Sequence, residues 1–241
     1  MTETRTVAYD HNGKTFEGYL ADGAKGRKAP GILVAHEGPG LTEHPRARAR
    51  MLAELGYVAF ALDLYGEPPP PMERARLLVR ELIADPALLR GRTHAALDCL
   101  KRQAGVDANR TAAIGFCFGG AAVLELARSG ADVAAVVGFH ARLATASSED
   151  ARNIKGKILI CTGTADPIVT ADQRLAFEKE MDAANVDWRM ELYGGVGHSF
   201  TNPEIDAFKF EGFAYDEHAD RHSWAAMRRF FDEVLGPVAA Q

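Results

Sequence analysis

Cysteine is scarce in this sequence: three stand in 241 residues, at positions 99, 117 and 161. An odd number cannot pair completely within one chain, and a core of this size needs no disulfide or metal to be stable. The polar start, MTETRTVAYDHNGK, lacks the apolar segment of an export signal. We therefore expect free thiols and a cytoplasmic location, with Cys99 and Cys161 inert inside apolar segments.

Long apolar runs and a large excess of one charge are also missing. No segment approaches the roughly 20 apolar residues that span a bilayer. The net charge is −5, and the arginines between positions 46 and 50 have no aromatic residues among them. We expect neither nucleic acid nor a membrane as a partner, while a monomer and a homodimer both stay open.

What the sequence does contain is an alternation of short apolar runs and amphipathic segments. The runs at 31–35, 57–62, 111–114, 133–137, 157–161 and 188–193 predict strands that are covered on both faces, as in a parallel sheet. Helical spacing occurs at 44–55, 88–103, 121–128, 171–184 and 223–235. This alternation predicts an α/β fold, and without a visible linker we expect one domain over residues 1–241.

Two local signals refine this prediction. Asn12-Gly13, between alternating apolar residues, predicts a small antiparallel hairpin over 5–20 at the N-terminus. The four prolines at 68–71 exclude a helix or a central strand there. Because they follow a predicted strand, we expect them to shape a loop over the carboxyl edge of the sheet.

The segment Gly115-Phe116-Cys117-Phe118-Gly119-Gly120 places a thiol between a predicted strand and a predicted helix. Ligands of open α/β sheets bind at the carboxyl ends of strands. Small residues at Gly115 and Gly119 permit a sharp, strained turn that exposes a nucleophile above the sheet, and the N–H groups of the helix favour a thiolate. The alternative is a buried structural cysteine, which is commonly inert.

Two later strand ends supply partners for a nucleophile. Asp166 lies in GTADP after the run at 157–161, and His198 lies in GGVGHSF after the run at 188–193. A nucleophilic thiol needs a base, and the base needs an orienting acid. The order nucleophile, acid, histidine is that of α/β-hydrolases. Taken alone, Asp166 is a good turn residue before proline and His198 an ordinary loop histidine, but their coincidence favours a triad.

The first long strand runs into His36-Glu37-Gly38-Pro39-Gly40. This loop should lie beside the cysteine turn, where the N–H groups of Gly38 and Phe118 can form an oxyanion hole. His36-Glu37 has no further ligand at zincin spacing, and His218 with His222 is interpreted as a solvated surface segment. We expect no metal and no cofactor.

Together these motifs resemble the dienelactone hydrolase family of α/β-hydrolases. The match runs from the HEGPG loop through Asp63-Leu64-Tyr65, GFCFGG and GTADP to GHSF. The resemblance implies an α/β-hydrolase fold, a mostly parallel sheet flanked by helices, with Cys117, His198 and Asp166 as a Cys-His-Asp triad. It also implies that Glu37 contacts the resting thiol and helps it to ionise. A structural hydrogen bond within the loop is the alternative for Glu37.

Two departures from the family concern the substrate. Its dienelactone enzymes carry an arginine four residues after the catalytic histidine, where this chain has Asn202. A second family arginine corresponds loosely to Arg76, for which a solvated helix face is the alternative. Because a bidentate carboxylate partner is missing, dienelactone itself is a doubtful substrate. Tyr65 and His140 are further candidates for the pocket wall, although core packing suits them equally well.

The thiol also limits the chemistry, since a tetrahedral adduct with an unactivated alkyl ester expels the thiolate again. We expect hydrolysis of small activated esters or enol lactones through an acyl-enzyme, with His198 as acid and then as base. A thioesterase or general carboxylesterase is the alternative among enzymes. The alternative outside enzymes is a family member without catalytic activity, which binds a small ligand or senses oxidants through Cys117.

Overall fold

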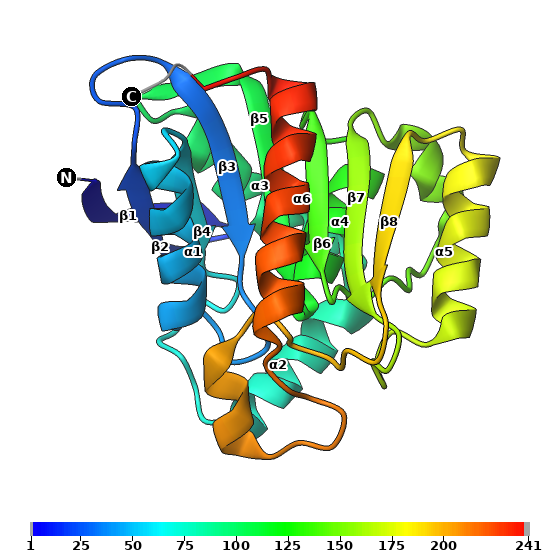
Figure 1. Ribbon diagram of the computed structural model, residues 1–241. Helices are drawn as coiled ribbons and strands as arrows, with labels where there is room; N and C mark the ends of the chain where they lie inside the picture. Colours follow the sequence, from blue (N-terminus) through cyan, green and yellow to red (C-terminus); the bar gives the residue numbers. More distant parts are fainter. Residues whose placement is uncertain (1, 239–241) are drawn as a thin grey trace.

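The computed structural model describes residues 2–238, which are organised by one eight-stranded sheet (Figure 1). The strand order is β1-β2-β4-β3-β5-β6-β7-β8. From β4 across to β8 neighbouring strands are parallel, whereas β2 is antiparallel to both β1 and β4. The predicted α/β fold with a small antiparallel edge is confirmed. The strands are β1 Glu3–His11, β2 Lys14–Asp22, β3 Ala29–Ala35, β4 Val58–Leu62, β5 Val106–Phe116, β6 Ala135–Phe139, β7 Lys157–Gly163 and β8 Trp188–Tyr193.

The hairpin turns at Asn12 and Gly13, as predicted. Both residues have positive φ, 50° and 75°, which is the requirement of a two-residue type I′ turn. The β1 and β2 strands pair in register from Glu3 opposite Asp22 to His11 opposite Lys14. This turn therefore positions the antiparallel edge, which joins the parallel strands through β4.

Helices cover both faces of the sheet. In Figure 1, α1 (Glu43–Glu54) and α6 (Glu217–Leu235) lie in front of it, and α3 (Pro86–Lys101) and α4 (Phe118–Arg128) lie behind it. The α5 helix (Ala171–Ala183) packs Phe177 into the same core cluster as α4. Every residue of β3, β4 and β6 is buried, which explains their continuous apolar runs.

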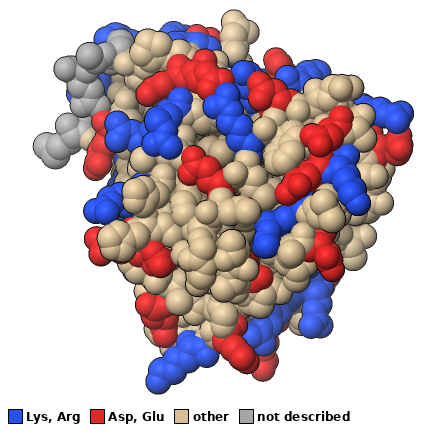
Figure 2. Space-filling model, turned by 45° about the vertical axis from the view of Figure 1, so that its right-hand side comes forward, with Lys and Arg blue, Asp and Glu red and all other residues tan. Residues whose placement is uncertain are grey.

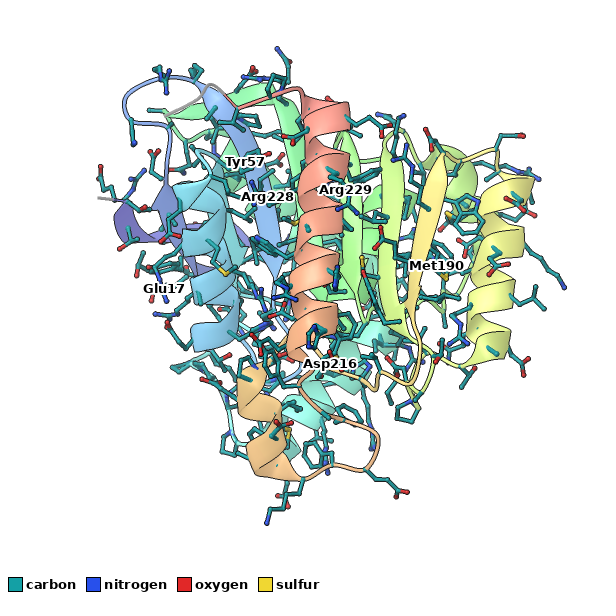
Figure 3. All side chains as sticks on the ribbon, in the orientation of Figure 1. Glu17, Tyr57, Met190, Asp216, Arg228 and Arg229 are labelled. Carbon is teal, nitrogen blue, oxygen red and sulfur yellow. The ribbon has the colours of Figure 1, made fainter. Side chains whose placement is uncertain are left out.

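Two helices begin earlier than their apolar spacing indicated. The α4 helix begins at Phe118, directly after Cys117. The α6 helix begins at Glu217, because Asp216 caps it: Oδ1 of Asp216 accepts from the N–H of Ala219 at 2.8 Å (Figure 3). The first of these shifts matters for the site, since it leaves the N–H of Phe118 without an acceptor inside the helix.

One helix was given no bounds in the prediction, although a helix face was the alternative considered for Arg76. The prolines themselves are irregular, but Met72–Ala84 forms α2 directly after Pro71, and α2 lies at the lower edge of the sheet in Figure 1. Proline is compatible with a helix start, where a missing N–H costs nothing. Two short 3₁₀ helices, Ser148–Asn153 and Pro203–Phe208, also lie in loops that have no periodic apolar pattern.

The surface carries charges of both signs side by side. Figure 2 shows lysine and arginine interspersed with aspartate and glutamate over the face drawn. Exposed pairs such as Arg189 with Glu233, at 2.7 Å, bring opposite charges together. In the stretch from residue 2 to residue 238, no helix has both the length and the hydropathy needed to cross a bilayer.

Candidate active site

Cys117 occupies a strained turn between β5 and α4. Its φ is 53° and its ψ −114°, a conformation that residues with side chains rarely adopt. The N–H of Cys117 donates to the carbonyl of Phe139 at 3.0 Å, which ties the turn to the neighbouring strand β6. The side chain is partly exposed at the carboxyl edge of the sheet. This is the conformation that the sequence predicted for a nucleophile.

The two glycines around the cysteine are required by close backbone contacts. A Cβ on Gly115 would lie 2.1 Å from the carbonyl oxygen of Gly119. A Cβ on Gly119 would lie 2.3 Å from the carbonyl oxygen of Ala35. These distances are far inside van der Waals contact, so the GxCxG pattern is explained by the approach of α4 to β5 and to the loop after β3.

His198 and Asp166 form a buried pair. His198 Nδ1 lies 2.7 Å from Asp166 Oδ2, and neither side chain is exposed. The other carboxylate oxygen, Oδ1, accepts from the N–H groups of Ile168 and Val169 at 2.7 and 2.9 Å. Because the Asp166 carboxylate accepts this hydrogen bond, Nδ1 of His198 carries the proton. Nε2 is then the nitrogen that can accept a proton from a nucleophile. Nε2 has no hydrogen-bond partner among residues 2–238.

The charge state of His198 depends on its neighbours. Burial alone would lower the pKa of His198, because it disfavours the charged form. A thiolate at Cys117 and the carboxylate of Asp166 outweigh burial and raise the pKa of His198 above its ordinary value. A proton on Nε2 of His198 is therefore stabilised by its surroundings, which suits a group that has to accept and return a proton.

Glu37 is buried beside this pair. Its Oε2 accepts from Nδ2 of Asn202 at 2.5 Å, while its Oε1 has no partner among the described residues. Burial raises the pKa of Glu37, and the bond from Asn202 and the charge of His198 partly oppose the shift. No hydrogen bond within residues 2–238 joins Glu37 to Cys117, so the carboxylate is held by Asn202 in the resting structure.

His44 lies 3.4 Å from the same oxygen of Glu37, measured from Nδ1 to Oε2. Burial and the adjacent Arg48 lower the pKa of His44 to about 3. The imidazole is therefore neutral at ordinary pH, and its contact with Glu37 is not an ion pair. The neutral ring does not compensate the carboxylate charge, which is stabilised mainly by the hydrogen bond from Asn202.

The loop after β3 is fixed by two ring side chains. His36 Nδ1 bonds to the carbonyl of Glu37 at 2.6 Å, and its Nε2 accepts from the N–H of Leu64 at 3.1 Å. Tyr65 donates from Oη to the carbonyl of Gly38 at 2.6 Å, and its ring stacks on Phe118 at 6.2 Å between centroids. The sequence motifs HEGPG and DLY therefore serve together to position Gly38 next to the nucleophile turn.

A cleft of about 240 Å³ opens at Cys117. Both predicted oxyanion residues, Gly38 and Phe118, line it together with the thiol. The unpredicted helix α2 supplies the remaining lining residues, which are Met72, Ala75, Arg76, Val79 and Arg80. Arg80 was missed because the spacing of four from Arg76 carries meaning only once a helix is known to lie there.

The four candidate substrate-binding residues lie in different places. Arg76 lines the cleft, and its guanidinium lies 5.5 Å from the centre of the Phe210 ring. Tyr65, His140 and Asn202 are buried behind the reacting groups. Tyr65 supports Phe118, His140 packs its ring 5.1 Å from that of His198, and Asn202 holds Glu37. Within the described part of the chain, no three His, Cys, Asp or Glu side chains are arranged to hold a metal ion.

Comparison with known proteins identifies the family of this chain. The sequence model of the dienelactone hydrolase family matches residues 16–235. The chain belongs to the dienelactone hydrolase family. This confirms the resemblance found in the motifs, and with it the α/β-hydrolase fold and the enzyme class, a carboxylic ester hydrolase.

Several relatives of this dienelactone hydrolase family member match over almost its whole length. A solved structure named m3DLH is 44% identical with a TM-score of 0.93, covering 97% of this chain and 99% of its own. A dienelactone hydrolase-like promiscuous phosphotriesterase from metagenomic libraries is 38% identical with a TM-score of 0.94, covering 98% and 99%. A Bradyrhizobium protein named as a probable 2-oxo-3-(5-oxofuran-2-ylidene)propanoate lactonase is 28% identical over 224 residues, 86% of this chain and 89% of the relative.

Proposed function

We propose that this dienelactone hydrolase family member cleaves small activated esters or enol lactones through an acyl-enzyme on Cys117. The observation that carries the proposal is the pairing of a strained, partly exposed thiol with an oriented histidine. Cys117 has positive φ at the start of α4, and His198 is fixed by Asp166 at 2.7 Å with Nε2 unpartnered. A nucleophile, a base and an orienting acid are the parts that acyl transfer needs.

The reaction follows from these positions. The Cys117 thiolate attacks the carbonyl carbon, and the N–H groups of Phe118 and Gly38 stabilise the oxyanion that forms. The proton that left the thiol is by then carried on Nε2 of His198. The carbon–oxygen bond to the leaving group breaks, and His198 donates that proton to the leaving oxygen. In the second half, His198 removes a proton from water, the hydroxide attacks the thioester, and the thiolate is released.

Glu37 has a separate part in this proposal. Its pKa is raised by burial, and one carboxylate oxygen is unpaired, so it can take the proton of the resting thiol. The thiolate would then be generated when substrate enters, rather than persisting in water. Asn202, bonded to Oε2 of Glu37, is a positioning residue for this step.

The cleft indicates which activated esters fit. Arg76 and Arg80 of α2 line it, and guanidinium groups pair well with a substrate carboxylate. Asn202, at the position of a family arginine, is engaged by Glu37. A substrate carboxylate would therefore be bound from the α2 side, and the Bradyrhizobium relative is named for a lactone that carries a propanoate.

A second substrate class is supported by one relative. The phosphotriesterase is 38% identical and matches over 98% of this chain. A neutral phosphotriester with a good leaving group presents a phosphoryl oxygen to the same two N–H groups and a phosphorus atom to the same thiolate. We therefore expect slow release of p-nitrophenol from a diethyl p-nitrophenyl phosphate, and this release should need Cys117.

The experiment that tests the main proposal follows p-nitrophenol release from p-nitrophenyl acetate over time. Wild type should show turnover, with a rapid first phase if deacylation is slow. Cys117→Ala should lose it, whereas Cys99→Ala, which removes a buried thiol on α3, should keep it. Equal rates in wild type and Cys117→Ala would reject Cys117 as the nucleophile.

The alternatives give different results in related measurements. A thioesterase would prefer an acyl thioester over the matching aryl ester in kcat/KM. A silent, oxidant-sensing member would show no turnover with any ester but would form a sulfenate at Cys117. An enzyme loses turnover on changing His198 or Asp166 as well, whereas oxidation of a sensor requires Cys117 alone.

A further inference from the structure

A second cavity lies next to the cleft at Cys117. Its volume is about 210 Å³. Its wall is formed by the end of α2, the start of α3, the middle of α4 and the loop after β6. The lining residues are Ile83, Pro86, Leu89, Ala121, Glu125, Arg142, Ala144, Thr145 and Ala146. Most of these side chains are apolar, so the cavity suits a hydrocarbon group.

The two cavities are lined by successive turns of the same two helices. On α4, Phe118 lines the cleft and Ala121 lines the second cavity. On α2, Val79 lines the cleft and Ile83 lines the second cavity. Residues three and four apart share one face of a helix. The two cavities are therefore neighbours along α2 and α4, and we refer to them together as the groove. Ala121 lies about 6 Å along the helix from Cys117.

Two charged residues, Glu125 and Arg142, line the second cavity, and the carboxylate of Glu125 is already satisfied. Oε2 of Glu125 accepts from Nε and a terminal nitrogen of Arg90, at 2.9 and 2.7 Å. Its Oε1 accepts from Arg128 at 3.1 Å and from Oγ1 of Thr145 at 2.8 Å. The carboxylate needs no further partner, so it closes the groove without attracting a charged ligand. Arg142 is exposed to solvent, so the residues that remain to contact a ligand inside the cavity are mostly apolar and fit an uncharged chain.

The position of the groove relative to His198 decides which half of an ester it takes. The leaving oxygen must come within reach of His198, which protonates it. The rings that surround His198 are His140 and Phe213, and neither lines either cavity among the residues described. The groove includes the oxyanion residues and none of the rings packed against His198, which favours the acyl side of an ester over its leaving group.

We propose that the groove between α2 and α4 is an acyl-chain subsite, which extends the substrate range to esters with medium-length apolar acyl groups. The proposal rests on Cys117 being the nucleophile. It adds that a chain attached to the carbonyl at Cys117 passes Phe118 and Val79 and ends between Ala121, Ile83 and Leu89. Each buried methylene should improve kcat/KM by about fourfold until the groove is full.

The test compares kcat/KM for p-nitrophenyl acetate, butyrate, hexanoate and octanoate. In wild type we expect kcat/KM for the hexanoate ester to be at least about tenfold higher than kcat/KM for the acetate ester. Ala121→Leu, which fills the groove, should lower the ratio of these two values about tenfold. Ala144→Leu, in the loop that forms the outer wall, gives a second variant should Ala121→Leu fail to fold. Ala176→Leu, at a separate surface cavity on α5, is the matched control.

The outcomes separate this proposal from the function on which it rests. If no ester is cleaved in a Cys117-dependent way, the proposed function fails. If acetate is cleaved but the ratio of kcat/KM for hexanoate to that for acetate is the same in Ala121→Leu, Ala144→Leu and wild type, the groove proposal alone is wrong. If the variants change the preference among acetate esters of different alcohols instead, the groove binds the leaving group and the acyl assignment is overturned.

Discussion

At the scale of single residues, the site depends on one thiol that the backbone holds in an unfavourable conformation. A positive φ at a cysteine costs of order 1–3 kcal/mol, and the surrounding contacts must maintain it. The hydrogen bond from Cys117 to Phe139 and the close approach of Gly115 to Gly119 supply those contacts. The strain places the thiol in the cleft and the first N–H of α4 beside it, which are the two requirements of acyl transfer.

Selective alkylation should distinguish Cys117 from the other two thiols. Cys99 and Cys161 are buried, and burial raises the pKa of both, so neither provides much thiolate at pH 7. Brief treatment with iodoacetamide should label the peptide that contains Cys117, as read by mass spectrometry, and should abolish esterase activity in parallel. Comparable labelling of Cys161 in the folded protein would contradict its burial.

Removing the amide that holds Glu37 should alter the pH dependence of the enzyme. A hydrogen bond to a charged group is worth about 1.5–3 kcal/mol, so Asn202→Ala should lower kcat/KM for p-nitrophenyl acetate by about tenfold or more. The Asn202 bond holds the pKa of Glu37 down, and its loss raises that pKa further. Where ionised Glu37 is needed, the acidic limb of the kcat/KM profile should therefore move to higher pH. A lower rate with an unmoved limb would indicate a merely structural role.

At the scale of elements, the close contacts of α4 give a sharp test. Alanine is a better helix former than glycine by about 1 kcal/mol, so Gly119→Ala would stabilise an unhindered helix. Here the added Cβ would lie 2.3 Å from the carbonyl oxygen of Ala35 and 2.5 Å from that of His36. We expect a net loss of about 1–3 kcal/mol in urea unfolding and a large fall in kcat, because the loop with Glu37 and Gly38 is displaced.

Gly194→Ala is the matched control for this change. Gly194 lies in the loop that leads to His198, and a Cβ there would meet no atom within 4 Å. Its stability and activity should stay close to those of wild type. Equal effects of the two substitutions would show that the crowding at Gly119 is not what fixes the turn.

Local signals account for the elements and residues that the sequence predicted. Buried parallel strands appear in the sequence as continuous apolar runs. The three residues proposed as a triad each follow such a run, so the local sequence was sufficient to predict that they lie at the same edge of the sheet. The α2 helix lacked such a signal, because Ala75, Leu78 and Leu82 are its buried residues among arginines and glutamates after four prolines. Its position over the thiol is a matter of tertiary packing. The Asn202–Glu37 bond was also hidden, since 165 residues separate its ends.

At the scale of the whole molecule, buried groups at the carboxyl edge tie distant segments together. Arg48 of α1 donates to the carbonyl of Thr201 at 2.5 Å and to Asp220 of α6 at 2.8 Å. His140, after β6, bonds to Oγ1 of Thr201 at 2.9 Å. The loop that carries His198 is thus held from α1, α6 and β6 together, and the catalytic edge should unfold with the rest of the sheet rather than separately.

The buried histidines make the stability of this edge dependent on pH. Burial lowers the pKa of His36 to about 4, and burial with Arg48 lowers that of His44 to about 3. Above pH 6.5 both rings are neutral in the folded and the unfolded chain, so they add no pH dependence. Below pH 6.5 the unfolded chain binds protons that the folded chain does not, and the free energy of unfolding falls until the folded rings titrate.

Urea unfolding at pH 7 and pH 5 measures this effect. At pH 5 each of these two histidines should lower the free energy of unfolding by on the order of 2 kcal/mol relative to pH 7. His36→Asn removes one of the titrating rings, so the difference between the two pH values should shrink by about that amount, whatever the substitution does to stability at pH 7. His222→Asn, at an exposed position on α6, is the matched control. A pH difference that His36→Asn leaves unchanged would mean that His36 binds its proton as readily in the folded protein as in the unfolded chain.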